Sequence, residues 1–320
     1  MLGMLKFGAI LVKEGNPRIQ KTIYNFFLSD PQCERFFFRI HELLETEVQQ
    51  IEASQSQSIS EKQNQRFLMN LLEFLRLFCE GHCLELQTYL SIQKRSKKSF
   101  DLVDTIAKML SSVKISTNNY SVVEKIFDAL TEFVQGPCKE NQKTIAGSKF
   151  LEFVHSLLND DPKIYYYANP LDQDNKDGIL PIEVWKTERL KYKSLITLTA
   201  LLEKMDLSES IVTRIVRTIP IAILKKNLLK IYERYSKLWV QDYTTDSFGW
   251  HEEEYDEDDQ GTIYPFSPNK NFLEKFECII ENGFNIFILM MNCIDLTGEG
   301  ENDLNDEEII EIAKELNQID

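Results

Sequence analysis

The sequence predicts an all-α fold, an armadillo-like α-solenoid of stacked helical pairs with two or three polar or acidic loops. Glycine and proline, which punctuate turn-rich β folds, occur only 12 and 9 times in 320 residues. Apolar residues recur at helical spacing, and no sustained alternation of apolar and polar residues indicates a strand. Helices that need cover on two sides alternate with one-sided helices, which favours stacked pairs, although no strict sequence period accompanies them.

The widest apolar helix is expected at residues 67–78. Its polar residues form only a narrow strip, made of Asn70, Glu73 and Arg76, so neighbours must cover it on at least two sides. One-sided apolar stripes follow at 102–113, 122–134, 211–219 and 224–235. The most apolar late segment, 282–294, is shorter than the roughly 18–20 residues that span a bilayer, so we expect a core helix there.

Polar and acidic stretches divide the chain. The block 252–259 holds seven acidic residues and is typical of a disordered, solvated insertion, with a weak cation-binding or partner-binding tail as the alternative. The expected organisation is leading helices at 1–52, a polar linker at 53–61, a central helical domain at 62–158, a loop at 159–182, a helical continuation at 183–240, an acidic disordered insertion at 241–267 and C-terminal helices at 268–320.

Charge and cysteine content limit the class of protein. A formal net charge of −15 argues against nucleic acid as a partner, since phosphate binding needs a basic surface. The compact basic cluster at 94–98 is interpreted as a solvated helix end. The six cysteines lie in or beside apolar stretches and are expected to be buried, reduced thiols of a cytosolic protein.

Two short segments look like metal sites and are not expected to be such sites. "CEGHC" places Cys79, His82 and Cys83 together, but a structural zinc site needs four ligands and no second pair follows. Segment 172–183 imitates a calcium-binding loop, with carboxylates at its first, third and twelfth positions. Its fifth position is a lysine and its sixth lacks the required glycine, so we expect no calcium-binding loop there.

The chain offers no recognisable catalytic machinery. Its four histidines are scattered, and no nucleophile elbow, phosphate-binding loop or dinucleotide fingerprint occurs. We therefore expect no enzyme activity and no cofactor.

The stretch "LTEFVQGPCKENQ" at 130–142 predicts a corner between two helices. Gly136 can adopt the left-handed conformation that ends a helix, and Pro137 suits the first turn of the next one. Cys138 is expected to point inward. Asn141 and Gln142 are expected to bond free backbone groups at this corner.

The residue pattern of this stretch resembles the RIH-associated domain of intracellular calcium-release channels, the inositol trisphosphate and ryanodine receptors. The family pattern has Thr-Glu-aromatic, then Gln-Gly-Pro-Cys, and then Asn-Gln. The matching residues that we single out are Thr131, Glu132, Gln135, Gly136, Pro137, Cys138, Asn141 and Gln142.

Three further blocks resemble the same family. "FLRLFCEGHCLELQTYLSIQ" matches at Phe74, Leu75, Cys79, Glu80, His82, Gln87 and Leu90, among others, although Gly81 and Cys83 replace family asparagines. "EGNPRIQK" is similar to a family helix entry at Gly15, Asn16, Gln20 and Lys21. "ENGFNIFIL" matches at Asn285 and its neighbours and leans toward the inositol trisphosphate receptor branch.

The resemblance implies that residues 62–158 are an RIH-associated domain with structural rather than ligand-binding motif residues. It implies a cytosolic module that couples ligand state to the gate of a tetrameric channel at the endoplasmic reticulum or a similar calcium store. Its partners would be other channel domains or subunits. The alternative is a free-standing α-solenoid scaffold derived from that domain.

Overall fold

The computed structural model describes residues 2–53, 60–113, 115, 119–159, 182–205, 210–244 and 270–297, and within these ranges it contains helices and no strand. The helices, in chain order, are α1 (Leu2–Val12), the short 3-10 helix η1 (Lys13–Gly15), α2 (Pro17–Ser29), α3 (Cys33–Ala53), α4 (Ser60–Cys79), α5 (Leu84–Ser91), α6 (Leu102–Ser112), α7 (Tyr120–Val134), α8 (Lys139–Gly147), α9 (Phe150–Leu158), α10 (Ile182–Leu202), α11 (Ser210–Thr218), α12 (Ile221–Thr244) and α13 (Lys270–Thr297).

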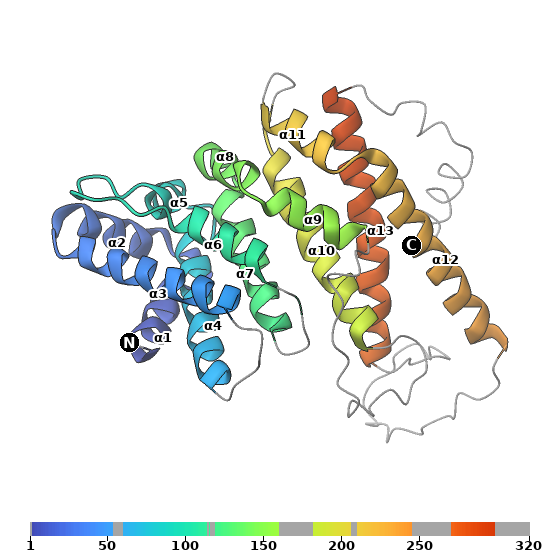
Figure 1. The fold of residues 1–320 in the computed structure, drawn as a ribbon, viewed down its shortest axis with the longest axis horizontal. Coiled ribbons are helices and arrows are strands. Elements are labelled where there is room, and N and C mark those ends of the chain that lie inside the picture. Colours follow the sequence, from blue (N-terminus) through green and yellow to red (C-terminus); the bar gives the residue numbers. More distant parts are fainter. Residues whose placement is uncertain are drawn as a thin grey trace, which may run out of the picture.

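Every third helix belongs to the same row. Helices α1, α4, α7, α10 and α13 lie side by side in that order (Figure 1). Helices α2, α5, α8 and α11 contact one another in sequence, and so do α3, α6, α9 and α12. We call α1–α3, α4–α6, α7–α9 and α10–α12 units 1 to 4, and we call their members the first, second and third helices.

The sequence led us to expect pairs, and the contacts instead recur every three helices. The difference comes from the second helices. Helices α5, α8 and α11 have only 8 or 9 residues each, so they turn the chain between the first and third helices without resembling a separate layer in the sequence. Helix α13 packs on α10 and α12, as the first helix of a further unit would.

The expected apolar stripes are confirmed. Helix α4 packs between α1 and α7, and its apolar side chains, including Leu71, Leu72 and Leu75, are buried. The stripes of α6, α7 and α11 are also buried. In α13 the side chains of Leu289, Met290 and Cys293 are buried, so the segment is a core helix as predicted. No helix in the described part of the chain is long and apolar enough to cross a membrane.

The described cysteines carry free thiols, and four of the five are buried. Burial raises the pKa of the Cys79 thiol well above its ordinary value and that of Cys293 to about 11. Such thiols stay protonated and unreactive at neutral pH. Residues 172–181 of the calcium-loop imitation and the acidic block at 252–259 lie outside the described residues, and the last two residues of the imitation, 182 and 183, begin α10.

Candidate functional site

The corner between α7 and α8 has the glycine conformation that the sequence predicts. Gly136 has φ of +103°, in the left-handed region, and the backbone N–H of Cys138 donates to the carbonyl of Val134 at 2.9 Å. Cys138 is buried, as expected. Pro137 was predicted in the first turn of α8, and this is wrong: Cys138 is the N-cap residue and α8 begins at Lys139, so Pro137 lies in the turn itself.

Asn141 holds the corner in place, as predicted. Its amide nitrogen donates to the carbonyl of Phe133 at 2.8 Å and to that of Gln87 at 3.0 Å. Its side-chain oxygen accepts a hydrogen bond from the Ser91 hydroxyl. Asn141 is fully buried, and it therefore ties α8 to both α7 and α5.

Gln142 was expected to bond backbone groups at the same corner. It instead bonds carbonyls at the corner that follows α10. Its amide nitrogen donates to the carbonyls of Ala200 at 3.0 Å and of Glu203 at 3.2 Å, where α10 ends. The last carbonyls of a helix have no partner within the helix, so they need donors from outside. Gln142 of unit 3 therefore closes the first helix of unit 4.

The same kind of contact occurs between units 2 and 3 and between units 1 and 2. Gln87 donates to the carbonyls of Glu132 and Gln135 at the end of α7, at 2.8 Å each. Gln20 donates to the carbonyl of Glu80, at the end of α4, at 2.7 Å. We call Gln20, Gln87 and Gln142 the glutamine clamps. All three side chains are at most 3% exposed.

Carboxylates make a second hydrogen bond at these corners, in which the earlier unit donates a backbone N–H and the later unit accepts with a glutamate side chain. Glu80 of unit 2 accepts a hydrogen bond from the backbone N–H of Glu14 in unit 1 at 2.7 Å. Glu203 of unit 4 accepts one from the N–H of Gly136 in unit 3 at 2.9 Å. Glu132 of unit 3 likewise interacts with the backbone N–H of Gly81 in unit 2. This contact lowers the pKa of Glu132, but burial has the larger effect and raises it.

Two of the corners, at Gly15 and Gly136, pack so closely that a side chain is excluded. A residue with positive φ follows the first helix of each unit: Gly15 at +61°, Gly81 at +76°, Gly136 at +103° and Lys204 at +52°. A Cβ atom on Gly15 would lie 2.7 Å from the carbonyl oxygen of Glu80, and one on Gly136 would lie 2.5 Å from the Cβ of His82. Gly15 and Gly136 are required by conformation and by space, whereas at Gly81 only the positive φ favours glycine.

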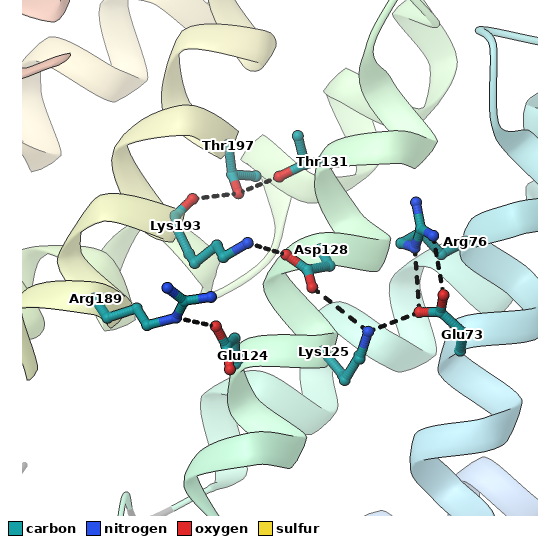
Figure 2. A network of polar contacts seen from close by, with 9 residues as sticks. All are labelled: Glu73, Arg76, Glu124, Lys125, Asp128, Thr131, Arg189, Lys193 and Thr197. Carbon is teal, nitrogen blue, oxygen red and sulfur yellow. Dashed lines mark hydrogen bonds and ion pairs between the residues drawn. The ribbon is translucent and has the colours of Figure 1, made fainter. Parts of the chain in front are cut away.

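A second set of polar contacts links the first helices along their length. Figure 2 shows charged side chains of α4, α7 and α10 that alternate in sign across the row. Lys125 of α7 lies 2.8 Å from Glu73 of α4 and 3.9 Å from Asp128. Asp128 lies 2.7 Å from Lys193 of α10. Arg189 of α10 pairs with Glu124 of α7, and the hydroxyls of Thr131 and Thr197 are 2.7 Å apart. We call these contacts the polar ladder.

Glu73 is the most strongly perturbed carboxylate in the polar ladder. Burial opposes its ionisation, but hydrogen bonds from Arg76 and Lys125 outweigh burial and lower the pKa of Glu73 to about 2. Part of the narrow polar strip predicted on α4 therefore faces a neighbouring helix. It is part of the contact between α4 and α7.

The structure brings most of the family-motif residues together at the corners or in the core beside them. Phe74, Leu75, Cys79 and Leu90 are buried. His82 has a left-handed backbone with φ of +60° and covers Gly136. Asn285 is separate, because its amide donates to Glu281 within its own helix α13. Among the described residues no three His, Cys, Asp or Glu side chains are grouped to hold a metal ion.

Sequence reasoning missed the repetition of the corner. Gly15, Gly81 and Gly136 are each followed, five or six residues later, by Gln20, Gln87 and Gln142. That short pairing of a glycine with a glutamine is the signal that could have revealed three repeated units. The surrounding residues differ so much that no longer period is visible.

Comparison with known proteins gives two matches to one family of calcium-release channels. Residues 62–158 match the family described as "RyR and IP3R Homology associated". The chain is also similar to the inositol 1,4,5-trisphosphate receptor itr-1 of Caenorhabditis elegans, with 31% identity over 126 residues. The matched region covers 35% of this chain and 4% of that receptor, so the chain spans only a small part of the length of this relative.

Proposed function

We propose that this chain is a cytosolic helical module of an intracellular calcium-release channel, because residues 62–158 match the family described as "RyR and IP3R Homology associated". In this role it passes the state of the ligand-binding part to the gate. The pore and the ligand pocket belong to other parts of such a channel. Its partners are other domains or subunits of a tetramer at the endoplasmic reticulum or a similar store.

The proposed architecture is an armadillo-like solenoid with three helices in each unit. The support for it is the row of first helices α1, α4, α7, α10 and α13, with the second and third helices stacked in their own rows. In a solenoid each unit contacts only its neighbours, so a displacement at one end reaches the other through each interface in turn.

The observation that carries the function is the clamp at each of these interfaces, with a second connection between units 2 and 3 and between units 3 and 4. Glutamine clamps tie consecutive units at the corners, and the polar ladder ties α4, α7 and α10 along their length. Buried amide contacts of fixed geometry resist sliding and rotation between units, because any shift leaves carbonyl groups without donors. Units tied in this way move together, which is the property a relay needs.

The experiment is a comparison of Gln142→Ala with Gln49→Ala in the complete protein that contains this chain. Gln49 is exposed on α3 and serves as the matched control. A relay predicts that Gln142→Ala lowers ligand-evoked calcium release while ligand binding stays unchanged, and that Gln49→Ala changes neither quantity. Equal calcium release from both variants would contradict the relay.

The transcript gives an independent test. A coding sequence with downstream segments long enough to span a membrane agrees with a channel. A transcript whose product contains no such segment, and no calcium flux on expression, would favour the scaffold that the sequence left open.

A further inference from the structure

The loop between α5 and α6 carries four cations within five positions, namely Lys94, Arg95, Lys97 and Lys98. We call residues 94–98 the basic loop. All four side chains are exposed, and among the described residues none of them forms an ion pair. The whole chain has a formal net charge of −15, so the basic loop is a local exception. A concentration of unpaired positive charge attracts anionic partners.

The backbone of the basic loop is held by the side chain of Gln93, which is only 2% exposed. Its amide nitrogen donates to the carbonyls of Tyr89 at 2.7 Å and of Phe100 at 3.0 Å, and its oxygen accepts the backbone N–H of Phe100 at 2.6 Å. The backbone N–H of Lys97 donates to the carboxylate of Glu34 on α3 at 3.0 Å. The loop is therefore closed at its base and tied to unit 1, and its cations project from a backbone of defined shape.

The cluster was interpreted from the sequence as a solvated helix end, but the structure gives this helix end another partner. Helix α5 ends at Ser91, and the carbonyls of Tyr89 and Leu90 in its last turn accept hydrogen bonds from the amide of Gln93. Carbonyls at the end of a helix need a donor from outside it, and this amide supplies one. The four cations are therefore free to contact a partner outside the loop.

An exposed aromatic side chain adjoins the basic loop. The ammonium group of Lys98 lies 5.1 Å from the centre of the Phe100 ring. On the other side, the ring centre of Phe38 on α3 is 5.5 Å from that of Phe100. Phe38 is 44% exposed. The boundary between units 1 and 2 thus offers positive charge and apolar surface beside each other.

We propose that the basic loop and Phe38 form a docking surface for an acidic peptide segment that carries an apolar side chain. Carboxylates of this segment pair with Lys94, Arg95 and Lys97. Its apolar side chain packs on the exposed part of Phe38. The chemistry of the segment follows from charge complementarity and from the apolar area that the surface leaves in water. The proposal does not depend on the channel function, and the segment can belong to a further part of the same polypeptide or to another one.

Other anionic occupants fit this surface less well. An anionic membrane meets a wide face of a chain with a formal net charge of −15 and is repelled by the rest of it, whereas a peptide contacts the loop alone. A phosphate ion gains nothing from the ring of Phe38. The acidic block at 252–259 is joined to α12 and α13, which lie at the other end of the row from α5 (Figure 1).

The experiment is calorimetric titration of the 320-residue chain with the peptide EDEFEDE, blocked at both ends. The loop variant Lys94→Glu with Lys97→Glu is compared with Lys143→Glu with Lys149→Glu, which changes the charge equally at two exposed lysines of unit 3. The control should bind the peptide as the unchanged chain does. The loop variant should bind at least tenfold more weakly, because two attractions become repulsions. Both variants should keep the melting temperature, since all four side chains are exposed.

A second peptide, EDESEDE, tests the apolar contact, and vesicles that contain phosphatidylserine are titrated in parallel. The serine peptide should bind about fivefold to tenfold more weakly, because the contact with Phe38 is lost. Equal affinities of the two peptides, equal affinities of the two double variants, or no saturable binding up to about 1 mM peptide would overturn the proposal. Loop-dependent binding of the vesicles without binding of the peptide would overturn it in favour of a membrane. Peptide binding that appears only after the acidic residues of 252–259 are replaced by their amides would assign the loop to that block instead.

Discussion

The glutamine clamps and the junction of α10, α12 and α13 join helices by opposite means. At the corners, neutral amides donate to carbonyl groups that end a helix. At the junction, Glu188 and Lys191 are each 3% exposed and lie 3.5 Å apart. Asn282 of α13 donates to Glu188, and Lys191 donates to Asn227 of α12.

The two regions differ in the free-energy cost of losing one partner of a contact. A clamp that is removed leaves neutral carbonyls without donors, which has a moderate cost. Removing one member of a buried ion pair leaves a charge in an apolar interior, which costs more than the intact pair contributes. The corners therefore tolerate change better than the junction, except at Gly15 and Gly136, where space is the constraint.

The largest expected effect is that of Gly136→Val. A β-branched residue at φ of +103° and a Cβ 2.5 Å from that of His82 together should cost about 5 kcal/mol and unfold or bend the chain. The measurement is urea unfolding followed by circular dichroism. Gly147→Val is the matched control, since a Cβ there has no heavy atom within 4 Å. Equal midpoints for the two variants would contradict the role of Gly136.

The junction is tested by Glu188→Leu, alone and with Lys191→Met. The single change leaves the Lys191 ammonium buried without its carboxylate and should cost about 3–5 kcal/mol. The double variant removes both charges and should recover most of this loss. If the two losses simply added in a double-mutant cycle, the pair would not be coupled and the proposed contrast with the corners would fail.

A smaller effect is expected for the clamp Gln142. Gln142→Ala should lower the free energy of unfolding by about 2–3 kcal/mol, because the carbonyls at the end of α10 lose their donor. Gln142→Met keeps the volume and separates the hydrogen bonds from packing. The exposed Gln49→Ala should change the stability by less than about 0.5 kcal/mol. Near-native stability of Gln142→Met would show that packing, not the amide, matters.

The sequence predicts the features of this fold that depend on local spacing. The apolar stripes, the width of α4 and the left-handed glycine at 136 follow from residues within a few positions of one another. The clamps could not be predicted in this way, because each glutamine bonds carbonyls 45 to 61 positions away. Glu188 and Lys191 were also missed, since charged residues three apart on a helix ordinarily face solvent.

The contribution of the polar ladder to stability could not be predicted from the sequence. Glu73 and Arg76 were predicted as part of a narrow polar strip on α4, and the sequence did not indicate that Glu73 also pairs with Lys125 of the next unit. Whether such a contact contributes to stability depends on how far the carboxylate is removed from water, which only the packing of α4 against α7 decides.

The smallest expected effect is the pH dependence of the ladder, tested with Glu73→Gln. The pKa of Glu73 is lowered to about 2 in the fold, so its contribution is fully present above the unfolded value near 4.5 and is lost as the pH falls toward 2. Partial exposure limits this contribution to about 1–2 kcal/mol. The free energies of unfolding of Glu73→Gln and of the unchanged protein should therefore differ at pH 6 and converge between pH 5 and 2.

The control is Glu42→Gln, which removes the exposed pair with Arg39 and should change stability by less than about 0.5 kcal/mol. A difference between Glu73→Gln and the unchanged protein that stays constant down to pH 2 would mean that the ionised form of Glu73 does not hold α4 to α7.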